Sequence, residues 1–147
     1  MMDQYNTVLE KLRDREIQLQ EYIDHLVAFN VKVSNDGEIL MINATSVRKL
    51  KASYSDIIGK KIWDLEWFSF SNDVKTKFID NFNRVKSGEI VNTEEIIEDN
   101  SGNFIAIDFI LNPVFDRHNI VSYIVVEGHD VTDKVRLQNE LLNSRKL

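Results

Sequence analysis

Hydrophobic positions along the chain change their spacing several times, and each change marks the start of a new expected element. Over residues 3–26, apolar side chains recur at alternating intervals of four and three without glycine or proline, which predicts a long amphipathic helix. Residues 28–34 alternate between apolar and polar positions, and residues 38–42 return as a second strand. Because residues 35–37 are Asn, Asp and Gly, which tolerate positive φ, the two strands are expected to form a β-hairpin.

The middle of the chain predicts helices. Asn43 stands where an N-cap is expected, before a short helix at residues 44–50 and a second helical turn at residues 51–59 that Gly59 can close. Residues 72–86 carry valine and phenylalanine at helical spacing and predict the longest internal helix.

Three further strands are expected at residues 90–98, 103–115 and 121–129, because turn-forming residues separate them. Pro113 near the end of the second strand indicates a sheet edge or a bulge, since proline cannot donate to the ladder. The order of elements predicts the α+β class: a five-stranded antiparallel sheet with short helices on one face, flanked by N- and C-terminal amphipathic helices.

The N-terminal helix carries an apolar seam with the spacing of a coiled coil. Glu16 interrupts this seam, and about three heptads are near the minimum for such an assignment. The seam predicts a homodimer; the alternative is a single amphipathic helix that packs on its own domain. The residues assigned to the dimer seam are Leu9, Leu12, Leu19, Ile23 and Leu26.

The last strand, residues 121–129, runs without a turn into a polar helix-forming segment at residues 134–147. Asp130, Thr132 and Asp133 can accept hydrogen bonds from the free N–H groups at the start of this helix, where negative charge is also favoured. A strand that continues directly from its sheet into an exposed helix could transmit a structural change in the domain to an output partner. We therefore assign signal transmission to these three residues.

Both tryptophans lie in an aromatic cluster at residues 62–68. Trp63 and Trp67 are four positions apart, so they are expected on one face of a helical turn. Such a pair either covers a ligand pocket as a lid or simply fills the core.

Composition narrows the classes of function. A net charge of −6 argues against nucleic acid, whose phosphates would be repelled. The chain contains no cysteine, so a disulfide, a thiolate nucleophile and a cysteine-based metal site are excluded. No apolar run reaches the length of about 18 residues that predicts membrane insertion, so one soluble, cytoplasmic domain is the simplest expectation.

Several short motifs, in their order and spacing, resemble those of the PAS family of sensor domains. The resemblance covers residues 26–134 and implies an N-terminal helix at residues 1–26, a PAS domain at 27–133 and a linker helix at 134–147. The last motif is similar to the family's Asp-Ile-Thr ending. The motifs are Asn35-Asp36-Gly37-Glu38-Ile39, Asn43, Tyr54-Ser55-Asp56-Ile57-Ile58-Gly59-Lys60, Asn100-Ser101-Gly102 and Asp130-Val131-Thr132-Asp133.

The resemblance implies a module that detects a signal or small ligand in a pocket between sheet and helices. It also implies a relay through the last strand and the C-terminal helix to a separate output domain, such as a histidine kinase. Each candidate pocket residue is equally well explained as core. The candidates are Phe29, Val31, Trp63, Phe68, Phe78, Phe82, Ile107, Phe109, Val126 and Gly128.

Departures from subfamily patterns bear on the cofactor, whose identity the sequence leaves unknown. Light-sensing relatives use a reactive cysteine and haem-binding relatives commonly use a histidine on the long helix, but this chain has no cysteine and residues 72–86 contain no histidine. Gly128 stands where a flavin-binding relative would place an amide side chain, and it contributes no polar group. Haem, flavin and metal are therefore not expected.

Two other roles are weighed against the sensor. A ligandless homodimerisation or protein-interaction module would use the N-terminal seam and the sheet face. An enzyme would need a catalytic constellation, yet the chain has no glycine-rich phosphate loop and no nucleophile motif. Carboxylate pairs such as Asp64 with Glu66 point apart on a helical turn. Catalysis is expected only in a partner output domain.

Overall fold

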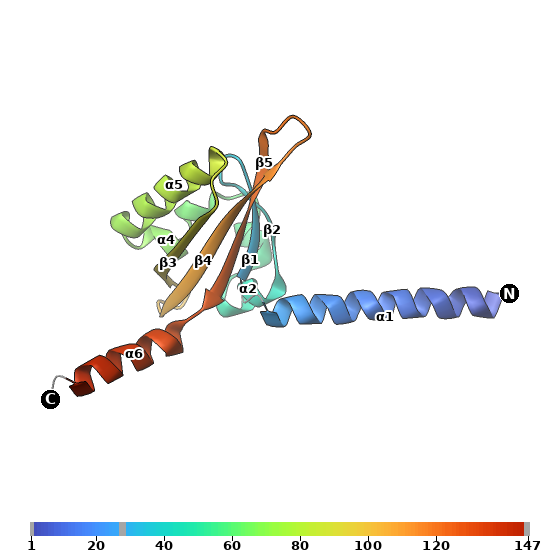
Figure 1. Ribbon diagram of the computed structural model, residues 1–147, viewed down its shortest axis with the longest axis horizontal. Coiled ribbons are helices and arrows are strands. Elements are labelled where there is room, and N and C mark those ends of the chain that lie inside the picture. Colours follow the sequence, from blue (N-terminus) through green and yellow to red (C-terminus); the bar gives the residue numbers. More distant parts are fainter. Residues whose placement is uncertain (1, 27–28, 146–147) are drawn as a thin grey trace.

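The computed structural model describes the backbone of residues 2–26 and 29–145, and the side chains of residues 3–19 and 29–145. In this part of the chain five strands form one antiparallel sheet in the spatial order β2-β1-β5-β4-β3, so β5 lies at its centre (Figure 1). This arrangement confirms the predicted fold class. The strands are β1 (Phe29–Ser34), β2 (Ile39–Ile42), β3 (Val91–Glu98), β4 (Phe104–Phe115) and β5 (Val121–Asp130).

The helices divide into two groups. Those between β2 and β3 cover one face of the sheet, whereas α1 and α6 project from it (Figure 1). The longest internal helix, α5, has the predicted bounds, with Ser71 Oγ accepting from the Val74 amide at its start. The helices are α1 (Met2–Leu26), α2 (Ala44–Lys49), α3 (Tyr54–Ile57), the 3-10 helix η1 (Ile62–Asp64), α4 (Glu66–Ser69), α5 (Asn72–Lys86) and α6 (Thr132–Arg145).

The first hairpin follows the predicted turn chemistry. Gly37 adopts φ +88°, which an L-residue rarely adopts, and an added Cβ there would overlap the Trp63 indole. Asn43 then caps α2, because its Oδ1 accepts from the Ser46 amide at 2.9 Å. The helical turn predicted at residues 51–59 is shorter in the structure and comprises only α3.

Pro113 confirms the expected irregularity of β4. The pairing of β3 with β4 ends at Val91 opposite Leu111, so Pro113 lies beyond β3 on that edge and needs no ladder donor there. The register of β4 with β5 also shifts just after Pro113, between Val114 and Phe115. Pro113 therefore lies on a part of β4 that has no strand partner on the β3 side and is close to a β-bulge.

The core lies between the helices and the inner face of the sheet. Alternate residues of β1 and β5 face it, as the sequence alternation predicted for β1. Phe78 and Phe82 of α5 pack there with ring centroids 6.5 Å apart, and Phe68 of α4 lies 4.2 Å from Phe78. The largest fully buried side chains are Phe68, Phe78, Phe82, Ile39, Leu50, Ile62, Ile97, Ile107, Leu111 and Ile124.

The expectation that Trp63 and Trp67 share one helical face is wrong. Leu65 is extended, with φ −73° and ψ 152°, and it separates η1 from α4. Because the helix is broken between them, the two rings diverge. Trp63 packs edge-on against Phe82 with centroids 5.1 Å apart, whereas Trp67 is only 2% exposed and enters the core beside the sheet.

Candidate functional site

A small cavity lies between the inner face of the sheet and the helices. Its volume is about 20 Å³, and its walls come from the strands β1, β3, β4 and β5 and from the helical segment that runs from α2 to α4. Every lining side chain is apolar or aromatic. The lining residues are Phe29, Val31, Leu50, Ile62, Trp67, Phe68, Ile97, Phe109 and Val126.

Five of the candidate pocket residues lie around this cavity: Phe29, Val31, Phe68, Phe109 and Val126. The structure places the other five elsewhere in or beside the core. Three lining residues escaped sequence reasoning, because a buried aliphatic side chain looks the same in sequence whether or not it borders a void. The three aliphatic residues are Leu50, Ile62 and Ile97. A fourth, Trp67, was considered with Trp63 as a lid or as core, but was not among the candidate pocket residues.

The candidates outside the cavity wall pack against one another. Phe78 and Phe82 fill the space between α5 and the sheet, and Ile107 is fully buried. Trp63 stands over the first hairpin at Gly37. These side chains support the cavity wall from behind.

Gly128 faces the interior from β5. It pairs with Phe29 on one side and with Phe109 on the other, and it is buried, whereas its neighbour His129 is exposed. An ideal Cβ on Gly128 would lie 2.7 Å from Ile107 Cγ2 and 3.3 Å from Phe109 Cδ1. The site therefore has no room for a side chain at this position, polar or apolar.

One polar contact reaches the cavity wall from outside. The indole Nε1–H of Trp67 donates to Asn100 Oδ1 at 3.2 Å, and the backbone N–H of Asn100 donates to the Leu50 carbonyl oxygen at 3.0 Å. Asn100 itself is exposed in the turn between β3 and β4. The turn was predicted, but its partners are 33 and 50 positions away in sequence, so no local signal could have named them.

Asp99 holds this turn together. The Asp99 carboxylate is 3% exposed and accepts from the backbone amides of Ser101 at 2.8 Å and Asn103 at 3.0 Å, with Lys51 Nζ at 3.7 Å. Burial alone would raise the pKa of Asp99, but the amide hydrogen bonds and the Lys51 charge outweigh it and hold the pKa below its usual value. The carboxylate is thus ionised at neutral pH and fixes the turn.

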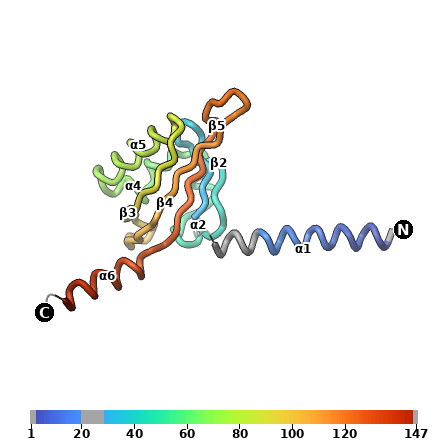
Figure 2. The backbone as a smooth tube through the Cα atoms, viewed as in Figure 1, coloured from blue at the N-terminus to red at the C-terminus, as the bar shows by residue number. Residues whose placement is uncertain are grey.

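The junction of β5 and α6 is built from side chains as well as backbone. Only Val131 separates the two elements, and the chain passes between them without turning back (Figure 2). Thr132 Oγ1 accepts from the Ala106 amide at 3.0 Å, while the Val131 amide donates to the Ala106 carbonyl oxygen at 2.8 Å. The start of α6 is therefore tied to the beginning of β4.

The three residues assigned to transmission play different parts in this junction. Asp130 Oδ1 accepts from the Thr132 amide at 2.9 Å, and Asp130 Oδ2 lies 3.7 Å from Lys49 Nζ at the end of α2. Asp133 is almost fully exposed and pairs only loosely with Arg136 one turn later, at 3.6 Å. Asp130 and Thr132 thus connect α6 to the domain, and Asp133 lies on its surface.

Comparison with known proteins identifies the family. A model of the PAS domain matches residues 26–133. The chain belongs to the PAS domain family. The match confirms the resemblance drawn from the sequence motifs, and PAS domains are typically sensory modules.

Two similar proteins are histidine kinases. Sensor histidine kinase TmoS from Ectopseudomonas mendocina is 25% identical over 140 residues, which make up 91% of this chain and 14% of the kinase. Hybrid signal transduction histidine kinase D from Dictyostelium discoideum is 28% identical over 114 residues, 76% of this chain and 7% of the kinase. This PAS domain therefore spans only a small part of either kinase.

The fold is also shared with solved structures. The crystal structure of the PAS domain of an HTR-like protein from Haloarcula marismortui has a TM-score of 0.59 and 18% sequence identity. The similarity covers 85% of this chain and 98% of that one.

The helices that flank the PAS domain expose their apolar residues. On α1, the seam residues Leu12 and Leu19 are 53% and 60% exposed. Leu9 is exposed as well, while the side chains of Ile23 and Leu26 fall outside the described residues. On α6 no residue is buried within the described range, although it carries three leucines.

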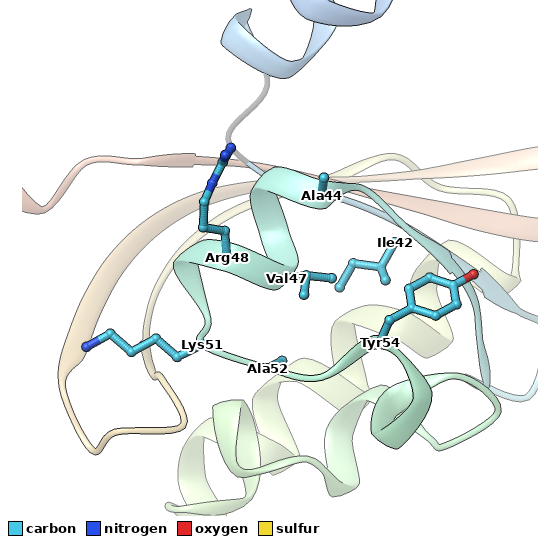
Figure 3. A pocket seen from close by; sticks show the side chains of 7 residues that line it. All are labelled: Ile42, Ala44, Val47, Arg48, Lys51, Ala52 and Tyr54. Atoms are coloured by element: carbon cyan, nitrogen blue, oxygen red, sulfur yellow. The ribbon is translucent and has the colours of Figure 1, made fainter.

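A larger groove opens on the outside of the PAS domain, beside α2 and α3 (Figure 3). Its volume is about 610 Å³. Figure 3 shows Ile42 and Val47 turned toward one another with the Tyr54 ring beside Ile42, while Arg48 and Lys51 extend away from them. The groove thus has an apolar floor and a cationic rim.

Among the side chains that the structure describes, no group of three or more His, Asp or Glu residues could hold a metal ion. Likewise, no helix in residues 2–26 and 29–145 combines the length and the apolar character needed to cross a bilayer.

Proposed function

We propose that this PAS domain is the sensory input module of a signalling protein. The internal cavity detects a signal or small ligand, and β5 relays the change through α6 to a separate output domain such as a histidine kinase. One observation carries the proposal: β5 lines the cavity with Val126 and continues almost directly into α6. The similarity to two histidine kinases supports the choice of output.

The relay needs only a small movement. Because β5 pairs with both β1 and β4, a change in the twist of β5 also changes its neighbours in the sheet. The hydrogen bonds of Thr132 and Val131 to Ala106 then transmit this change in twist to α6. A helix that continues into a coiled coil can convert a slight rotation into a switch, because packed helices have discrete arrangements. We propose that any catalysis lies in the output domain. We also propose that this PAS domain is located in the cytoplasm.

The relay can be tested without knowing the natural signal. In a fusion that continues α6 into a histidine-kinase core, Val126→Ala alters the cavity wall and serves as an artificial input. We expect Val126→Ala to change kinase activity about threefold or more, as couplings of about 0.5–2 kcal/mol allow. The double substitution Asp130→Ala/Thr132→Ala should abolish this response.

Asp133→Ala provides the matched control, since this exposed carboxylate contacts only the next turn of α6. The fusion that carries it should respond to Val126→Ala as the unaltered fusion does. If Val126→Ala changes kinase activity equally with and without the Asp130 and Thr132 side chains, the proposed relay is wrong. Circular dichroism of each fusion checks that the PAS domain remains folded.

A second candidate is a ligandless module for homodimerisation or protein interaction. The exposed seam of α1 favours it, because Leu9, Leu12 and Leu19 form an apolar stripe that a second copy could cover. In this role the Val126→Ala substitution would leave kinase activity unchanged, whereas loss of the dimer would alter it.

A further inference from the structure

The chemistry of the cavity wall restricts the ligand. The only polar group among the lining side chains, the Trp67 indole N–H, already donates to Asn100. A charged or strongly polar molecule would lose its hydration in this cavity without finding a partner. A compact, uncharged, apolar molecule loses little on leaving water and gains dispersion contacts with the wall.

The cavity must widen before such a molecule can enter. Its volume of about 20 Å³ has room for about one water molecule, which needs about 10–15 Å³ on the same measure. A ligand larger than this can be accommodated only if part of the wall moves. Access to the cavity therefore depends on the contacts that hold its wall in place.

One exposed residue fastens several parts of the wall. Asn100 accepts from the Trp67 indole of α4 and donates to the Leu50 carbonyl at the end of α2. Ile97, a third lining residue, lies on β3 just before the same turn. Without the Asn100 side chain, Trp67 of α4 would lose its hydrogen bond to the turn, whereas the backbone bond to Leu50 would remain.

Residues 50–52 close the C-terminal end of α2 and also contact the β3–β4 turn. Lys51, which follows Leu50, adopts φ +54°, and the Ala52 amide donates to the Val47 carbonyl oxygen at 3.0 Å, as in a Schellman ending of a helix. The ion pair between Lys51 Nζ and Asp99 Oδ2, at 3.7 Å, holds this residue against the β3–β4 turn. The contacts of the turn with Leu50 and Lys51 therefore help to hold residues 50–52 in place.

The same segment separates the cavity from the outside. Leu50 lines the cavity, while the two residues after it, Lys51 and Ala52, line the outer groove of about 610 Å³ (Figure 3). The groove floor at Val47 and Tyr54 is apolar and could receive an apolar molecule first. Movement of residues 50–52 would join the groove to the cavity.

We propose that the β3–β4 turn, residues 99–102, is a latch on the cavity, and that the ligand it admits is a small, uncharged, apolar molecule. This inference rests on the proposed sensory function and names the ligand class and the entrance of the same site. The groove beside α2 and α3 is the entry path.

The test uses benzene as the probe and benzoate as its charged counterpart, on the 147-residue chain. In proton–carbon correlation spectra, benzene is expected to shift the methyl resonances of Leu50 and Ile97, and benzoate is not. Asn100→Ala removes the acceptor for the Trp67 N–H, so binding no longer has to break that bond. Benzene should then bind about threefold to tenfold more tightly.

Two substitutions in the same turn serve as controls. Asn100→Asp keeps an oxygen acceptor for Trp67 and should bind benzene as the unaltered chain does. Ser101→Ala keeps the backbone N–H that Asp99 binds, and it should also leave the affinity unchanged. If Asn100→Ala does not fold, Lys51→Met, which removes the charge that pairs with Asp99, replaces it with the same expected direction.

Equal affinity of benzene for the unaltered chain and for the latch variant would overturn the latch. Shifts with benzoate as large as those with benzene, or no shift with benzene in either protein, would overturn the ligand class. The kinase fusion separates these outcomes from the relay, because its input is Val126→Ala. A failed latch with an intact relay would leave the proposed function standing.

Discussion

At the scale of single residues, Gly128 is a position where the interior leaves no room for a side chain. The backbone of β5 approaches β4 so closely here that Ile107 and Phe109 occupy the space of a Cβ. No positive φ is involved, so the restriction comes from packing alone. Overpacking a well-filled core forces neighbouring side chains out of their rotamers.

Gly128→Ala should lower the free energy of unfolding by about 1–3 kcal/mol, because the new methyl group would displace Ile107. Urea denaturation followed by circular dichroism measures the change. His129→Ala, one residue further on the exposed side of β5, is the control and should change the stability by less than about 0.5 kcal/mol. A Gly128→Ala protein as stable as the unaltered chain would show that Ile107 can move at little cost.

At the scale of elements, the stability of the connection between the sheet and α6 depends on a side chain that replaces a strand partner. β5 ends at Asp130, and Thr132 Oγ1 then accepts the Ala106 amide that would otherwise lack a partner at this end of the ladder. Ala106 is buried, so its N–H would be costly to leave unpaired. The threonine therefore holds the first turn of α6 against β4.

Thr132→Val keeps the shape of the side chain but removes the acceptor. We expect local opening at the junction to become easier by about 1–3 kcal/mol, the cost of an unsatisfied buried donor. Amide hydrogen exchange at Ala106 reports this opening and should become faster in Thr132→Val. Thr132→Ser retains the hydroxyl and should exchange as the unaltered chain does; similar rates in the valine and serine variants would contradict this role of the hydroxyl.

At the scale of the whole molecule, two exposed helices frame a well-packed domain. α1 and α6 carry apolar residues outside the core, and helices without tertiary contacts are only marginally stable in water. Pairing of the α1 seam between two copies would cover Leu9, Leu12 and Leu19 and stabilise this helix. The molecule is therefore expected to be a dimer whose helices strengthen each other.

Leu12→Asp should convert this dimer to a monomer, since it places a charge in the centre of the apolar seam. Light scattering should show the mass halved, and the circular dichroism signal of helix should fall with it. Gln18→Asp introduces the same charge away from the seam and should preserve the mass. A chain that begins at Leu26 should also be monomeric, and an unchanged mass in both shortened and Leu12→Asp proteins would rule out pairing through α1.

The periodicity of the sequence and its turn residues were sufficient to predict the sheet, the long helices and the continuous passage from β5 to α6. These features depend on local chemistry: alternation in β1, the cap at Asn43 and the left-handed glycine at position 37 act within a few residues. For the same reason, the α5 helix and the edge at Pro113 were predictable before any tertiary contact was known.

Only the tertiary structure decided which aromatic side chains border the cavity and which fill the core. One extended residue, Leu65, sends Trp63 and Trp67 to different places, and nothing in the spacing of the two tryptophans reveals it. Asn100 meets Trp67 and Leu50 only because β3 folds back beside the helices. Such contacts depend on packing between distant segments, so the sequence alone determined the elements and the fold class, and the folded chain determined the site.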